Sequence, residues 1–139
     1  MKKIHLYLVL ITHSLGFFSF LGNAKNLMKI ATIGSVTLYM DLSMTYQQKV
    51  DAIKKFLRGQ ITHVLPYHPD LIVLPETCDR PHGMKAKEQY EYFEVRRDQF
   101  LDFLSNIASK NRCYIALGMN RPYNVGIWRN SSVMLDRNG

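Results

Sequence analysis

The residue best placed for catalysis is a glutamate. Glu76 follows residues 71–74, a run of four large apolar residues, with Pro75 between them. Such a run is typical of a strand buried on both faces of a parallel sheet. In open α/β sheets, reactive groups gather just past the carboxyl ends of the strands. Glu76 is therefore the candidate catalytic residue, acting as a general base, and the alternative is a structural glutamate that caps the following loop.

Two cysteines are the remaining candidates for a nucleophile. Cys78 lies two residues after Glu76, where the backbone would have to turn sharply to aim both side chains at one atom. Cys113 begins an apolar segment and is expected to pack as a small hydrophobic residue. We therefore assign neither as the nucleophile, Cys78 being the better candidate of the two. Their pairing in a disulfide stays open, because the sequence does not determine the distance between them.

No metal or phosphate site is predicted. His63 and His68 lie five residues apart around a proline turn, without a third or fourth ligand nearby. No cysteine or histidine pair has zinc spacing, and no glycine-rich phosphate loop is present. The loop after Glu76 also carries Arg80 and His82. These two side chains could contact a substrate or hold the loop together, and the sequence does not separate the two interpretations.

The composition is that of a globular chain. Of its 139 residues, 47% are hydrophobic and 21% charged, and the formal net charge is +7. These fractions exclude an acidic disordered chain and a disulfide-rich miniprotein. Two of the 18 basic residues lie in residues 1–24, so residues 25–139 carry 16 basic and 11 acidic side chains. This small excess does not indicate a nucleic-acid-binding protein, and no nucleic acid is expected as a partner.

Residues 1–24 predict a secretory signal peptide. A positive start with Lys2 and Lys3 precedes an apolar stretch at residues 4–21 and a small-residue cleavage site ending at Ala24. The alternative is an uncleaved membrane anchor, since a span needs at least about 17 residues. Histidine and hydroxyl side chains interrupt the stretch, which favours cleavage. We expect a secreted or periplasmic protein of residues 25–139, forming one domain without a stable membrane span.

The mature chain predicts alternating strands and helices. We expect a strand within residues 28–36 and a helix over residues 46–57 that stops at Gly59 or continues towards Pro66. The strand of residues 71–74 follows, and then a single helix over residues 88–111. Strand, helix and strand with these connections form a βαβ unit, for which a right-handed crossover is expected.

Two more strands are predicted near the carboxyl end. They cover residues 112–118 and 129–135, with a loop over residues 119–126 that is rich in Asn, Pro and Gly. Residues 136–139 then predict a hairpin turn, because Asn-Gly after an apolar strand is a strong hairpin signal. The sequence stops at this glycine, so we expect the returning strand to be missing and the fold to be incomplete.

The segment Asp-Leu-Ile-Val-Leu-Pro-Glu-Thr, residues 70–77, resembles the glutamate block of the carbon–nitrogen hydrolase family, the nitrilase superfamily. Residues 29–34 are similar to that family's first strand, and residues 46–57 to its first helix. Residues 114–118 and 129–136 are similar to the two strands that precede its catalytic lysine. The resemblance covers nearly all of residues 28–139.

This resemblance implies an α/β fold that is the N-terminal portion of an αββα sandwich. It also implies homodimers in the full-length protein, no cofactor and a Glu–Lys–Cys catalytic set. In this set the cysteine attacks an amide or nitrile carbon, the glutamate relays the proton, and the lysine stabilises the oxyanion. Glu76 alone maps onto this sequence. The lysine would lie on the strand returning from residues 136–139, and the cysteine further on.

The function implied is that of a fragment of an exported carbon–nitrogen hydrolase acting on small-molecule amides or nitriles, inactive as it stands. The alternatives are a secreted non-catalytic α/β binding module and a family member turned to acyl transfer. Residues 77–83, Thr-Cys-Asp-Arg-Pro-His-Gly, depart from the aromatic residue and Gly-Tyr pair of many members. Because this loop lines the family's substrate pocket, the substrate class stays open.

Overall fold

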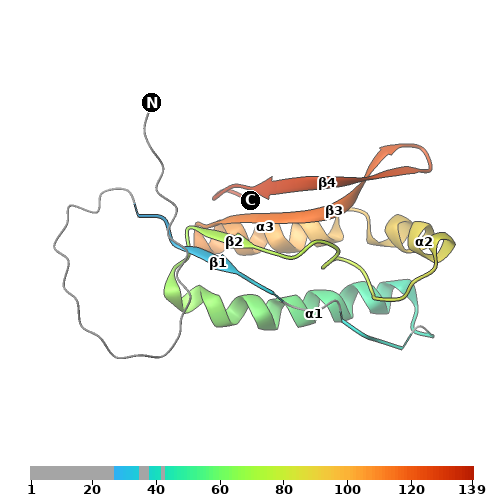
Figure 1. Cartoon of the computed structure of the whole chain (residues 1–139), viewed down its shortest axis with the longest axis horizontal. Coiled ribbons are helices and arrows are strands. Elements are labelled where there is room, and N and C mark those ends of the chain that lie inside the picture. Colours follow the sequence, from blue (N-terminus) through green and yellow to red (C-terminus); the bar gives the residue numbers. More distant parts are fainter. Residues whose placement is uncertain (1–26, 35–37, 42) are drawn as a thin grey trace.

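The computed structural model describes residues 27–34, 38–41 and 43–139 (Figure 1). The predicted signal peptide lies outside the described residues. The chain contains the predicted strand, helix and strand at its start, followed by two helices and two strands. In order, they are β1 (Ile30–Thr32), α1 (Tyr46–Val64), the 3-10 turn η1 (Leu65–Tyr67), β2 (Leu71–Val73), α2 (Ala86–Arg96), α3 (Gln99–Asn111), β3 (Tyr114–Asn124) and β4 (Ile127–Leu135). No helix in these ranges is long and apolar enough to cross a membrane.

The strands form one mixed sheet in the order β1-β2-β3-β4. The first three are parallel, with Leu71 paired to Ile30 on one side and to Tyr114 on the other. β4 runs antiparallel to β3, from the Ile115–Leu135 pair towards the hairpin. Parallel pairing of β1 with β2 through helix α1 confirms the predicted βαβ unit.

Helix α1 begins with a reciprocal cap. The Thr45 side chain accepts a hydrogen bond from the backbone of Gln48, whose side chain accepts one from the backbone of Thr45. The helix does not stop at Gly59 but continues to Val64, because Ile61 extends the buried stripe of the preceding turns. A glycine inside a helix costs about 1 kcal/mol, which burial of one isoleucine offsets.

The single helix expected over residues 88–111 is wrong, because two helices occupy this range. α2 ends at Arg96, and Arg97 has a φ of 38°, outside the helical region. The apolar positions keep helical spacing across this break, so the pattern contains no signal for it. The break comes directly after Arg96, whose side chain has no exposed surface.

The loop expected over residues 119–126 is also wrong. β3 continues to Asn124, and β4 begins at Ile127, so the connection is a tight hairpin at residues 125 and 126. Gly126 has a φ of 71°, which suits a residue without a side chain. Pro122 lies inside β3 beside a register shift. Pairing with β4 therefore overrides the loop-like composition of the segment.

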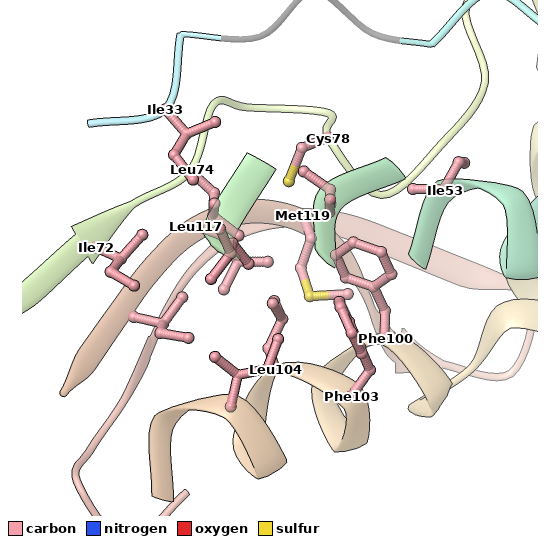
Figure 2. Close-up of a cluster of buried hydrophobic side chains, with 14 of the residues drawn as sticks. Ile33, Ile53, Ile72, Leu74, Cys78, Phe100, Phe103, Leu104, Leu117 and Met119 are labelled. Atoms are coloured by element: carbon pink, nitrogen blue, oxygen red, sulfur yellow. The ribbon is translucent and has the colours of Figure 1, made fainter. Parts of the chain in front are cut away.

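The two faces of the sheet differ in burial. Figure 2 shows Ile72, Leu117 and Met119 of the sheet on the same side as Phe100 and Leu104 of α3, and all five are buried. On the opposite face, side chains of β2 and β3 are half-buried and Met134 of β4 is 61% exposed. The prediction that residues 71–74 are buried on both faces is therefore wrong for the described structure, since Leu71 and Val73 retain partial exposure.

We expect substitutions on the two faces to differ in cost. Ile115→Ala removes a side chain with no exposed surface and should lower the free energy of unfolding by about 2–5 kcal/mol. Met134→Ala should change it by no more than about 0.5 kcal/mol. Urea denaturation of the whole chain measures both values. Equal losses for the two variants would contradict the assignment of the buried face.

Candidate functional site

Glu76 lies just past the carboxyl end of β2, where the sequence predicts it. The segment leaving β2 stays beside β3, because the amide of Leu74 donates to the Ala116 carbonyl at 2.8 Å and that of Thr77 to the Gly118 carbonyl at 3.4 Å. Thr77 has a φ of 62°, a left-handed conformation that turns the chain immediately after Glu76. The Glu76 side chain is thereby placed over β3, and it is exposed to solvent.

Gly118 of β3 provides the space that Glu76 occupies. A Cβ atom at position 118 would lie 3.3 Å from Cγ of Glu76 and 3.6 Å from its Cβ. The first distance is slightly tighter than ordinary van der Waals contact, and the second is within it. The absence of a side chain at position 118 therefore lets Glu76 approach the strand without having to shift.

Asn130 of β4 orients the carboxylate. Its side-chain amide donates a hydrogen bond of 2.6 Å from Nδ2 to Oε1 of Glu76. Glu76, Gly118 and Asn130 line an open hollow of about 280 Å³, together with Ser131 and Ser132. Three separate segments, the end of β2, the middle of β3 and the middle of β4, thus meet at this hollow.

The sequence alone did not identify Gly118 and Asn130 as parts of the site. Gly118 pairs with Ser132, and Asn130 with Asn120, in the β3–β4 ladder. This register brings Gly118 and Asn130 to the same edge as Glu76. Extending both strands through residues 119–126 to a tight hairpin would have given this register. The Asn, Pro and Gly residues of that segment favour a loop instead, so the sequence did not indicate it.

Neither cysteine joins the site. Cys78 and Cys113 are both buried free thiols. Burial, reinforced by the nearby Asp79 carboxylate, raises the pKa of the Cys78 thiol to about 12. Burial also raises the pKa of Cys113. A thiol that stays protonated at neutral pH is a poor nucleophile. Cys113 packs in the hydrophobic core, as predicted.

The other polar residues of the loop make contacts within the chain. Arg80 donates to Oε1 of Gln89 in α2 at 2.6 Å. The His82 ring lies 4.7 Å from the Tyr39 ring. Of the two interpretations of Arg80 and His82, these contacts favour a role in holding the loop together. Within the described ranges, no cluster of three or more His, Cys, Asp or Glu side chains could hold a metal ion.

Comparison with known proteins relates this geometry to a fold. No protein-family model and no curated protein matches the sequence. Solved structures do match, among them an amidase from Nesterenkonia sp. AN1 in complex with acrylamide, at 14% identity and a TM-score of 0.57. A carbon–nitrogen hydrolase from Helicobacter pylori G27 matches at 17% identity and a TM-score of 0.53. A glutamine-dependent NAD(+) synthetase from Cytophaga hutchinsonii matches at 15% and 0.55.

The chain has the nitrilase fold of these amidase and carbon–nitrogen hydrolase structures. Each of the three structures aligns with 80% of this chain. The chain spans 39% of the amidase, 36% of the carbon–nitrogen hydrolase and 17% of the synthetase. It therefore has the structure of one portion of the nitrilase fold, which confirms the fold class and the family resemblance predicted from the sequence.

We expect both cysteines to resist alkylation in the native state. Because the pKa of Cys78 is raised to about 12, only about one thousandth of the thiol is ionised even at pH 9, and labelling of native Cys78 by iodoacetamide should stay slow at pH 7 and at pH 9. The same protein unfolded in urea should label fully at both sites. Mass spectrometry of tryptic peptides measures the labelled fraction. Rapid native labelling at Cys78 would show that its thiol is accessible and ionised.

Proposed function

We propose that this chain supplies the general base of a carbon–nitrogen hydrolase, and that the protein cleaves the C–N bond of a small-molecule amide or nitrile. The observation that carries the proposal is Glu76, placed at the end of β2 and hydrogen-bonded to Asn130, in a fold shared with amidases. One of those amidases was solved with acrylamide, as a double mutant in which a glutamate and a cysteine are replaced. A glutamate and a thiol are the pair that nucleophilic amide cleavage requires.

The two oxygens of Glu76 have different surroundings. Oε1 accepts the hydrogen bond from Asn130. Among the residues that the structure describes, no side chain donates to Oε2. A carboxylate with one oxygen bound and the other open has a defined orientation and still has lone pairs free to accept a proton. This arrangement suits a base that takes a proton from a nucleophile and passes it to a leaving amine.

The proposed reaction needs two further groups. In the resembled family they are a lysine, which stabilises the oxyanion, and a cysteine, which forms the thioester. Cys78 and Cys113 do not suit the second role, because both are buried. Because the chain spans only 39% of the amidase structure, we propose that both groups lie in a longer form of the protein, and we assign hydrolysis to that complete product.

The test is a matched pair of substitutions in that complete product. Glu76→Gln removes the base and should lower kcat for amide hydrolysis by about 100-fold or more. Glu94→Gln makes the same chemical change at an exposed residue of α2 and should leave kcat unchanged. Ammonia release from a panel of small amides and nitriles measures both. Normal turnover by Glu76→Gln would contradict the role of Glu76, and no turnover by the wild type on the whole panel would contradict the proposed reaction.

We also propose that the protein is exported, on the basis of residues 1–24. In a bacterial host, the exported form should begin at Lys25, which N-terminal sequencing determines. Replacing Val9 and Leu10 by lysine interrupts the apolar stretch and should keep the uncleaved protein inside the cell. Recovery of the uncleaved wild type from the membrane fraction would show that the segment is an anchor instead.

A further inference from the structure

An ion pair without solvent exposure joins the Glu76 loop to helix α2. Oδ2 of Asp79 lies 2.6 Å from Nη1 of Arg96, and both side chains are 0% exposed. Burial raises the pKa of the Asp79 carboxyl, and the Arg96 guanidinium acts in the opposite direction. Moving two charges out of water carries a large desolvation penalty, so a buried pair is often no more stable than apolar residues of similar volume.

The polar atoms of this pair are incompletely satisfied. In the part of the chain that the structure describes, Oδ1 of Asp79 and Nε of Arg96 have no hydrogen-bond partner. A buried polar atom without a partner is destabilising, because it loses its hydrogen bonds to water and gains none in return. Stability alone therefore does not explain why the chain has this buried ion pair. The contacts of Arg96 and Asp79 indicate a role in positioning other segments.

Arg96 contacts both strands of the β3–β4 hairpin. Its Nη2 donates to the backbone carbonyl of Asn120 in β3. Its guanidinium carbon lies 5.7 Å from the centre of the Trp128 ring in β4. Trp128 is two residues from Asn130 along β4, and Asn130 is the residue that donates to Glu76. Arg96 thus contacts β4, the strand that carries Asn130, the hydrogen-bond donor to Glu76.

Asp79 connects Arg96 to the base itself. It lies three residues after Glu76. Its backbone carbonyl accepts a hydrogen bond of 2.6 Å from the Tyr92 hydroxyl in α2. Backbone and side chain of Asp79 are therefore both bound to the same helix. The pair contacts the loop that carries the base on one side and the hairpin that carries its donor on the other.

We propose that the Asp79–Arg96 pair positions Glu76 relative to Asn130. This inference rests on the proposed function, in which Glu76 is the general base and the orientation of its carboxylate affects the rate. Arg96 and Asp79 do not contact the reacting atoms and act as positioning residues. The fork of the guanidinium, with one nitrogen towards Asp79 and another towards the Asn120 carbonyl, sets the separation of loop and hairpin.

A double variant separates positioning from stability. Asp79→Leu with Arg96→Met replaces the pair by apolar side chains of similar volume, and the protein should still fold. We expect kcat for amide hydrolysis to fall by about 10- to 100-fold with KM changed by less than about threefold, because a misplaced base affects the chemical step. The matched control is Glu94→Leu with Arg97→Met, which removes an exposed ion pair between α2 and the residue that follows it and should leave kcat unchanged.

A second readout does not require enzyme activity. The two side-chain amide protons of Asn130 should differ strongly in NMR chemical shift, because Asn130 donates one of them to Glu76. Glu76→Ala provides the reference spectrum without this bond. In the Asp79→Leu, Arg96→Met protein, the Asn130 signals should move towards that reference. If the wild type hydrolyses no amide but the signals move, the proposed function fails and the positioning inference stands.

The inference is overturned if the double variant folds and keeps both the wild-type kcat and the wild-type Asn130 signals. If the double variant does not fold, Arg96→Lys retains the charge but loses the fork. A folded Arg96→Lys protein should show the same loss of kcat and the same movement of the Asn130 signals, and wild-type values would overturn the inference. Failure of both proteins to fold would assign the pair to stability, against the proposal.

Discussion

The buried ion pair of Asp79 and Arg96 joins segments that no regular secondary structure connects. The Glu76 loop, helix α2 and the β3–β4 hairpin all meet at the Arg96 guanidinium. Arg96 is also the last residue of α2, and the chain turns at Arg97 directly after it. The break in the predicted helix of residues 88–111 thus lies directly beside the buried arginine.

The prediction succeeded where a pattern is local. Residues 71–73 form β2, within the run of four apolar residues that predicts it. Glu76 lies at the sheet edge because it directly follows that strand. Each of these conclusions needs fewer than ten consecutive residues.

The prediction failed where distant residues decide. Arg96 is a charged residue of a helix, which is usually solvated, and its burial depends on Asp79 in another segment. Pro122 and Asn124 have loop-like character, yet pairing with β4 places them in a strand. Gly118 and Asn130 enter the site only through the β3–β4 register. Local composition does not contain that information.

The separation of the site residues along the chain has a consequence for synthesis. Asn130 is made 54 residues after Glu76. At about 5–20 residues per second, a ribosome needs roughly 3–11 s to add those residues. During this interval β2 and the loop can already exist, but the donor to Glu76 does not. Because Asn130 is made after Glu76, the carboxylate acquires this orientation only after β4 has been synthesised. A nascent chain therefore carries the glutamate for seconds before the geometry around it is complete.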